Sequence, residues 1–137
     1  MSPRIDLSHI VVGTIGHAEL VVAPEHTAPK VGSGRIAVLA TPVMINLIEA
    51  AALAAAEHHL PAGYQSLGTH LNVRHIAATP VGMRVKARAE VVAVEGRNIT
   101  FRVEVHDEKD LIGDGTPTRV VVDVAKFDRR VQAKLRA

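Results

Sequence analysis

The chain has 137 residues, a length that fits a single domain with a core of its own. Hydrophobic residues make up 47% of it but aromatic residues only 2%, which argues against proteins that stack single-stranded nucleic-acid bases on aromatic rings. The formal net charge of +2 is mild, and the basic segment 126–136 is expected to be a solvated end rather than a nucleic-acid-binding arm.

The chain contains no cysteine, which excludes disulfides and thiolate metal ligands and fits a reducing compartment. Its N-terminal residues do not show the charged, then apolar, then small pattern of a signal peptide. We therefore expect a soluble cytoplasmic protein that needs no cofactor and does not bind a membrane.

The first recognisable element is a strand over residues 16–22, in which Ala18, Leu20 and Val22 share one face. Residues 24–34 are rich in Pro and Gly and predict a loop that could form a mobile flap. A short extended segment, 36–39, follows it.

Residues 41–57 give the strongest helix signal in the chain. Thr41 suits the N-cap and Pro42 the first helical position. From residue 43 to 56 the only polar side chains are Asn46 and Glu49, so we expect a helix that is buried on every side. At about 24 Å it is too short for a confident membrane span.

After the Pro/Gly stop at residues 60–63 the hydrophobic period changes to two, as in β-strands. We expect four antiparallel strands joined by short turns, the last interrupted by a bulge at residues 113–115. The inner face of the first should carry Leu67, Thr69, Leu71, Val73 and His75; the other strands are expected at residues 83–91, 99–105 and 111–124.

An apolar helix and a sheet with one apolar face have one economical arrangement, in which the sheet curls round the helix. The predicted fold class is therefore α+β, a hot-dog fold with an antiparallel sheet curled around one long buried helix. Residues 1–137 are expected to form this single domain.

Two titratable residues are placed on facing inner surfaces of this fold. Glu49 lies on a helix so apolar that its carboxylate must be hydrogen-bonded, paired or neutral. His75 follows the strand parity that points toward the helix. Either one alone could be structural, but together they are typical of an acid–base site.

Three further positions bear on chemistry. Thr41 places a hydroxyl beside the free N–H groups of a helix start, and Gly68 permits close backbone approach in a strand, where its N–H could hold an oxyanion. A helix cap and a simple bulge are the structural alternatives. A metal site is not expected, because the neighbouring His58 and His59 should not share a helix face.

The sequence resembles the hot-dog thioesterase family typified by fluoroacetyl-CoA hydrolysis, over residues 10 to 130. The likeness rests on the spacing of several short motifs: Val38-Leu39-Ala40-Thr41-Pro42 with Glu49, residues 63–75 with Thr79-Pro80-Val81-Gly82, Val94-Glu95-Gly96-Arg97, Ile112-Gly113-Asp114-Gly115-Thr116, and Arg119.

The resemblance implies that Thr41, Glu49 and His75 are catalytic, with Gly68, His75 and Arg119 contacting an acyl-CoA or related thioester. It leaves open whether the acyl group passes through a covalent intermediate or is attacked directly by water. It also implies a homodimer with the site near the interface. Two other functions stay open, an enoyl-thioester hydratase and a non-catalytic thioester binder or sensor.

One departure from the family concerns the segment before the helix. Enzymes selective for fluoroacetyl thioesters resemble each other in a lid that contains Phe, whereas residues 27–34 here contain no aromatic residue. We therefore expect a thioesterase without strong preference for the fluoroacetyl group.

Overall fold

The computed structural model describes residues 5–136. Residues 1–4, which belong to the N-terminal segment considered for a signal peptide, and residue 137 lie outside the described part. Within residues 5–136, no helix combines the length and the apolar character that crossing a membrane requires.

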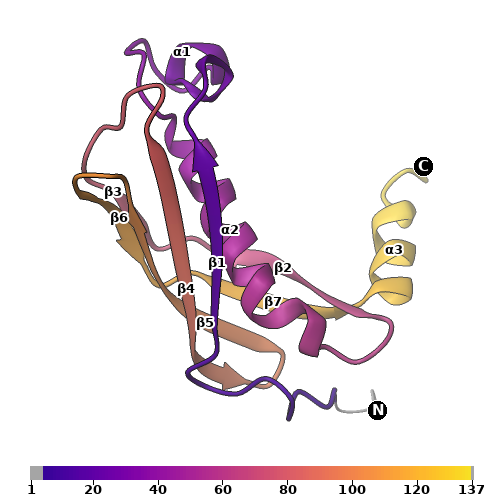
Figure 1. Cartoon of the computed structure of the whole chain (residues 1–137). Coiled ribbons are helices and arrows are strands. Elements are labelled where there is room, and N and C mark those ends of the chain that lie inside the picture. The colour runs from indigo at the N-terminus through magenta and orange to yellow at the C-terminus, as the bar shows by residue number, and fades with distance from the viewer. Residues whose placement is uncertain (1–4, 137) are drawn as a thin grey trace.

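Seven strands and three α-helices follow one another in the described chain, with two short 3-10 turns (Figure 1). Their bounds are β1 Ile15–Val21, η1 Pro24–His26, α1 Ala28–Val31, α2 Thr41–Ala56, η2 Glu57–His59, β2 Tyr64–His70, β3 Val73–His75, β4 Arg84–Glu95, β5 Asn98–His106, β6 Leu111–Gly115, β7 Thr118–Asp123 and α3 Val124–Ala133.

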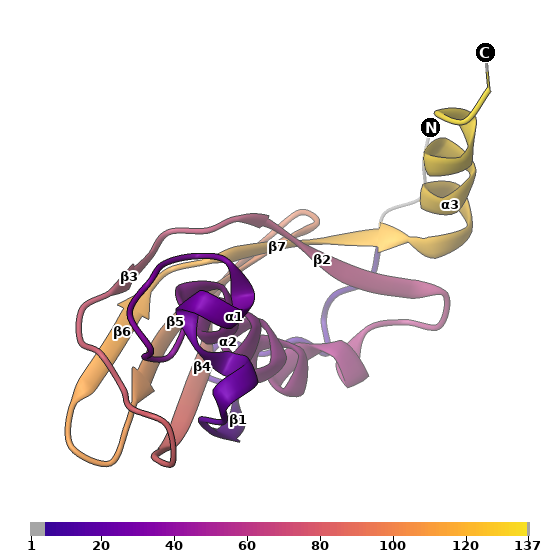
Figure 2. The ribbon, with the colours of Figure 1, turned by 90° about the horizontal axis from the view of Figure 1, so that it is seen from above.

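The strands form one antiparallel sheet in the order β1-β4-β5-β6-β3, while β7 pairs with β5 and with β2. Thus β2 with β3, and β6 with β7, act as the two halves of two bent strands. Viewed from above, the sheet curves around α2 (Figure 2), which packs against β1 and β4. The predicted hot-dog arrangement is confirmed.

The core lies between the concave side of the sheet and α2. Its largest fully buried side chains include Met44 and Ile48 from α2 and Phe101 from β5. The alternation predicted for the central strands is confirmed: Val85, Ala87, Ala89 and Val91 of β4 and Ile99, Phe101, Val103 and Val105 of β5 are all buried.

One glycine sets how closely β1 approaches α2. A Cβ atom placed on Gly16 would lie 2.3 Å from the Ala51 carbonyl oxygen and 2.3 Å from the Ala55 nitrogen. Both are backbone atoms, so no side-chain rotation could relieve the contact. The alanines of α2 and this glycine together allow strand and helix to pack backbone against backbone.

Two predictions about α2 are wrong. The N-cap is Ala40, not Thr41, and no side chain caps the helix; the Thr41 hydroxyl is turned toward β3 instead. The helix is also not buried all round, because Asn46, Ala50, Leu53 and Ala54 form an exposed stripe. The sheet curls round only part of the helix circumference.

The inner face predicted for residues 67–75 is only half right. Val73 and His75 are partly buried, but Leu67 and Leu71 are 41% and 52% exposed, and Ser66 is buried in their place. The cause is an irregularity between Gly68 and His70, followed by a break in the strand before β3. Each such break shifts the alternation, so β2 and β3 present opposite parities to the helix.

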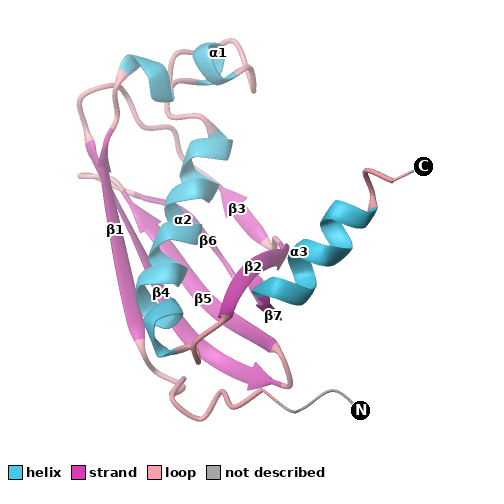
Figure 3. Ribbon diagram, turned by 90° about the vertical axis from the view of Figure 1, so that its right-hand side faces the viewer, coloured by secondary structure: helices cyan, strands magenta, loops and turns pink. Residues whose placement is uncertain are grey.

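The segments on either side of the core also differ from the prediction. Part of the expected loop 24–34 folds as η1 and α1, and the expected last strand is divided at Thr116-Pro117 into β6 and β7. Residues 124–133 form α3, a helix with no buried residue that projects from the sheet (Figure 3). The basic end is therefore solvated, as expected, but helical.

Candidate active site

Thr41 and His75 meet at the start of α2. The Thr41 Oγ1 lies 2.7 Å from His75 Nδ1, a short hydrogen bond between the first residue of the helix and the last residue of β3. When the neutral ring carries its proton on Nε2, the hydroxyl donates to the Nδ1 lone pair. The pair then has the geometry of a nucleophile, or a nucleophile-positioning hydroxyl, beside a general base.

The surroundings of His75 favour its neutral form. Burial lowers the pKa of His75 below its ordinary value of 6.5, and the nearby Ala77 backbone offsets only part of this effect. His75 Nε2 is buried and has no hydrogen-bond partner among residues 5–136. A neutral imidazole with a free Nδ1 lone pair is the state in which histidine accepts a proton.

An open cleft of about 400 Å³ gives access to this pair. One wall comes from the segment before α2, including Ala28, Gly34 and Ile36, and the other from His75 and the residues after β3. Apart from the His75 imidazole, none of its lining residues is aromatic. From the segment 27–34, Ala28, Ser33 and Gly34 line the cleft, and their side chains are small or absent.

Glu49 lies further along α2 and is paired, as the sequence required. Its Oε2 accepts a hydrogen bond of 3.0 Å from Arg119 Nη1 of β7, while its side chain keeps 38% of its surface exposed. The carboxylate is therefore neither isolated nor fully buried. Arg119 shares the inward face of β7 with Val121, and only 6% of its surface is exposed.

Gly68 of β2 completes this second group. A Cβ atom at Gly68 would lie 2.9 Å from Glu49 Oε2 and 3.9 Å from Arg119 Nη1, so glycine allows the carboxylate to approach the strand. On the side of β2 that faces away from β7, the Ser66 N–H donates to the Glu57 carboxylate. Because N–H groups alternate along a strand, the Gly68 N–H also points to the open edge of β2.

Sequence reasoning missed two residues of this group, Ser66 and Glu57. Arg119 donates from Nε to Ser66 Oγ (2.8 Å) and from Nη2 to the Ser66 carbonyl oxygen (2.9 Å). Ser66 Oγ in turn donates to Glu57 Oε1 (2.7 Å). The available signal was a serine inside a strand and a glutamate ending an apolar helix, but nothing in the sequence linked them.

The predicted site residues thus fall into two groups within one protomer: Thr41 with His75, and Glu49 with Gly68 and Arg119. Thr41 and Glu49 are eight positions apart on α2, which is about 12 Å along the axis. No hydrogen bond joins the two groups among the described residues. Glu49 therefore does not orient His75 directly within a single chain.

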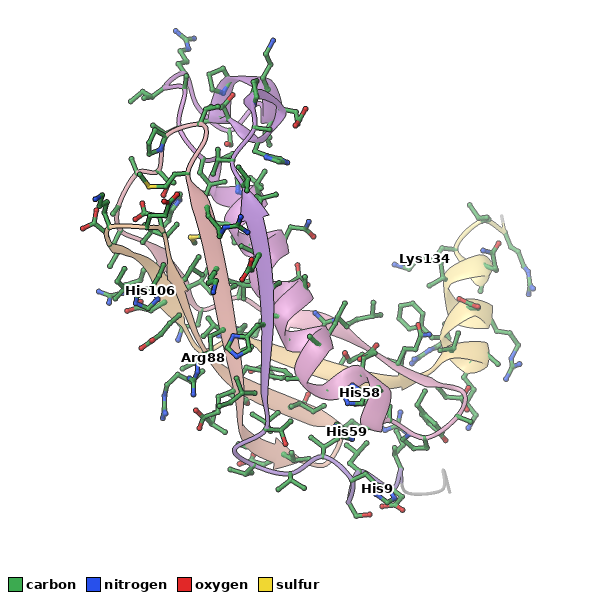
Figure 4. The ribbon with its side chains drawn as sticks, in the orientation of Figure 1. His9, His58, His59, Arg88, His106 and Lys134 are labelled. Carbon is green, nitrogen blue, oxygen red and sulfur yellow. The ribbon has the colours of Figure 1, made fainter. Side chains whose placement is uncertain are left out.

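His58 and His59 lie at the end of α2 that is remote from α1 (Figure 4). The expectation that they cannot share a face is wrong, because their ring centroids are 4.0 Å apart in the 3-10 turn η2. Across residues 5–136, however, no three His, Cys, Asp or Glu side chains converge as metal ligands would.

A family model described as fluoroacetyl-CoA-specific thioesterase matches residues 22–125. This chain belongs to that thioesterase family. Its family relatives include the fluoroacetyl-CoA thioesterase of Streptantibioticus cattleyicolor, 44% identical over 97 residues, which are 71% of this chain and 70% of the relative. Membership places the chain among thioester hydrolases.

Solved structures agree with the family assignment. A fluoroacetyl-CoA thioesterase structure superposes with a TM-score of 0.85 at 38% identity, covering 90% of this chain and 96% of that chain. A thioesterase superfamily member from Thermus thermophilus gives 0.80 at 30% identity, with 98% of each chain covered. A hot-dog-like protein from Thermanaerovibrio acidaminovorans, 22% identical with a TM-score of 0.87, supports the fold alone.

Proposed function

We propose that this thioesterase hydrolyses a small acyl-CoA to the free acid and CoA. The observation that carries the proposal is the 2.7 Å contact between Thr41 Oγ1 and a half-buried His75, at the wall of an open cleft in a chain of this family. Relatives solved with ligands support the CoA part, because one is a complex with fluoroacetate and CoA and another with acetyl-CoA.

His75 supplies the base in this reaction. It takes the proton from the attacking oxygen as that oxygen adds to the thioester carbonyl, and it returns the proton to the CoA sulfur as the C–S bond breaks. The attacking oxygen is Thr41 Oγ1 or a Glu49 carboxylate oxygen in a covalent route, which needs a second attack by water, or water itself in a direct route. A carboxylate has no proton to give, so in the Glu49 route CoA leaves as the thiolate. The mass of the acid-quenched enzyme distinguishes these routes.

Glu49 and Gly68 would act on the same thioester from the other side. The Gly68 N–H, free of β7, is a donor suited to the oxyanion, and Glu49 would activate water or accept the acyl group as a mixed anhydride. Arg119 has no free reach into the cleft, since its guanidinium is occupied by Glu49 and Ser66. We therefore assign it to holding Glu49 rather than to contacting the substrate.

A homodimer would bring the two groups together. The outer edge formed by β2 and β3 is unpaired in one protomer and carries the exposed Leu67 and Leu71, which favours edge pairing with a second copy. The Ser66 N–H donates to Glu57 and the Gly68 N–H is assigned to the oxyanion, so the edge that is free for pairing runs from residue 69 to residue 75.

Symmetric antiparallel pairing of that stretch has its twofold axis near residues 71 and 72. Gly68 of one subunit then lies opposite the end of the partner's β3, and Glu49 faces the Thr41–His75 pair of the other chain. Two equivalent composite sites result, each with the base from one subunit and the carboxylate from its partner.

A panel of acyl-CoA thioesters with a thiol-detecting dye tests the function. We expect release of CoA from short acyl groups, with loss of activity and an unchanged melting temperature in Glu49→Gln. The change keeps the shape of the side chain and removes its charge. Binding without CoA release would support a sensor instead, and hydration of an enoyl thioester without CoA release would support a hydratase.

Mixing inactive variants tests the composite site. Glu49→Gln and His75→Ala dimers, each inactive alone, should regain up to about a quarter of wild-type activity after equal mixing and subunit exchange, because half of the dimers are then mixed and each mixed dimer contains one intact site of two. If each site lies within one chain, a mixed dimer contains no intact site and no activity returns.

The lid supports a further expectation about selectivity. The residues of the segment 28–36 that line the cleft beside Thr41 are Ala28, Ser33, Gly34, Arg35 and Ile36, none of them aromatic. We expect kcat/KM values for fluoroacetyl-CoA and acetyl-CoA within about tenfold of each other, because no aromatic side chain of the segment 28–36 is present to contact the fluorine atom. A preference of several orders of magnitude would show that selectivity arises elsewhere.

A further inference from the structure

The carboxylate of Glu49 is held by a chain of hydrogen bonds that runs back into α2. Arg119 Nη1 contacts one oxygen of Glu49, and the rest of the guanidinium is fixed by Ser66. Ser66 is fixed by Glu57, whose two oxygens accept from the Ser66 backbone and hydroxyl at 2.9 and 2.7 Å. The order is Glu57, Ser66, Arg119, Glu49, and it begins and ends on the same helical segment.

Ser66 is the junction because its hydroxyl and its backbone each contact both Arg119 and Glu57. Its hydroxyl oxygen accepts from Arg119 Nε, which leaves the hydroxyl proton to donate to Glu57. This direction follows from chemistry, since a guanidinium offers only donors and a carboxylate only acceptors. The Ser66 rotamer is thereby determined from both sides, and Ser66 is 5% exposed.

The charges along the chain alternate, with one arginine between two glutamates. A buried guanidinium with one acceptor could rotate about its bond to that acceptor, whereas Nε, Nη1 and Nη2 of Arg119 each donate to a different acceptor atom. Only one Glu49 oxygen is used by Arg119. The other is left for a substrate or water, and its position is set by the guanidinium.

We propose that Ser66 and Glu57 are positioning residues that fix Arg119 and, through it, aim the Glu49 carboxylate at the thioester. This inference rests on the proposed hydrolysis, since it assigns Glu57 and Ser66 to the same reaction. Glu57 lies at the C-terminal end of α2, on the side of Glu49 away from Thr41, so its effect on catalysis must pass through the intervening residues.

Glu57→Gln is the sharpest test, because glutamine keeps the shape but offers only one acceptor oxygen. Its NH₂ group either faces the Ser66 N–H or must donate to Ser66 Oγ, which reverses that hydrogen bond and turns the hydroxyl proton away from residue 57. We expect kcat to fall about tenfold with KM changed less than about twofold, since the carboxylate is misaimed while the cleft stays intact. Glu90→Gln is the matched control, because within residues 5–136 the one salt bridge of Glu90 is to Arg88 of the same strand, β4.

A double-mutant cycle separates positioning from general stability. If Glu57 acts through Glu49, Glu57→Gln should have no further effect on the residual rate of Glu49→Gln. The same factor in both backgrounds, or an unchanged kcat in Glu57→Gln, would overturn the inference. Ser66→Ala provides a second variant that removes the junction hydroxyl, with the same expected non-additivity.

A measurement independent of turnover uses the Arg119 Nε–H resonance in ¹H–¹⁵N spectra, identified by its loss in Arg119→Lys. It should be shifted and exchange faster with solvent in Glu57→Gln and Ser66→Ala, but not in Glu90→Gln. An unchanged resonance would refute the proposal that Glu57 and Ser66 fix the position of Arg119. A wild-type protein with no thioesterase activity would refute the proposed function and the positioning role together, whereas an active wild type with normal Glu57→Gln refutes only the latter.

Discussion

At the scale of single residues, burial and one short contact define the chemistry of His75. The ring is not paired with a carboxylate in the described chain, and its Nδ1 is directed at the Thr41 hydroxyl. Desolvation favours the neutral imidazole, which is the form that accepts a proton. These surroundings suit the role of base that we propose for His75.

This leads to a prediction about pH. Because burial lowers the pKa of His75, the neutral form should persist below pH 6.5, and kcat/KM should fall only on the acid side of that value. A pH profile with acetyl-CoA measures this. A midpoint above 6.5 would show that a negative charge, as the partner's Glu49 would be in the proposed dimer, outweighs the effect of burial. A rate that stays constant on the acid side would contradict the role of His75 as the base.

A substitution tests the same role directly. His75→Ala should reduce turnover at least ~100-fold while remaining folded. A variant that keeps its rate would contradict this role.

A second prediction concerns Gly68. Gly68→Ala places a methyl 2.9 Å from Glu49 Oε2, so the carboxylate must leave its position beside Arg119. We expect kcat to fall about 10- to 100-fold, as for a misplaced catalytic group, with the melting temperature nearly unchanged because a side-chain end can move. Gln65→Ala, at an exposed position of the same strand, serves as control. An alanine variant with normal kcat would exclude a catalytic position for Glu49.

At the scale of elements, the hydrophobic pattern correctly predicted the helix and the strands that have regular, uninterrupted geometry. The extent of α2 and the buried faces of β4 and β5 follow from spacing alone. The parity of β2 does not, because an irregular residue leaves no mark in the alternation. Asp123 did carry a signal for α3, since its side chain accepts from Lys126 N as an N-cap, but the preceding strand pattern obscured it.

The contact between β1 and α2 gives a prediction about stability. Gly16→Ala forces a Cβ atom against the backbone of Ala51 and Ala55, so strand and helix must separate. Overpacking of this kind costs about 1–3 kcal/mol or more, and a melting temperature lower by about 5–10 °C is expected. His17→Ala, an exposed neighbour, should have little effect. A Gly16→Ala protein as stable as the wild type would show that the two elements can shift apart freely.

At the scale of the whole molecule, the sequence predicted a set of candidate site residues but not how they divide into two groups. Thr41, Glu49 and His75 were selected from residue type, parity and family resemblance, and the structure places them in two groups separated along α2. Ser66 and Glu57 could not be selected, because their pairing spans the turn between α2 and β2. Spatial pairing across a loop has no periodic signature.

The assembly prediction belongs to this scale. Sedimentation equilibrium should give a dimer, and Leu71→Asp should weaken it by at least tenfold in dissociation constant, since it places a charge on the proposed interface. Activity should fall in parallel as the monomer accumulates. Val12→Lys, which changes an exposed apolar residue before β1, is the control. A monomer at all concentrations would contradict the dimer and the composite site.

The break between β2 and β3 has a consequence for how related sequences can vary. Gly68 lies before the break and His75 after it, and both face inward. In one uninterrupted strand an even-numbered and an odd-numbered residue would point to opposite faces, so the break changes which positions face the helix. Removing one residue there would join the two halves into one continuous ladder and turn either the glycine or the histidine outward. The length of this short irregular segment is therefore constrained as tightly as any side chain of the site, even where its residue types are free to change.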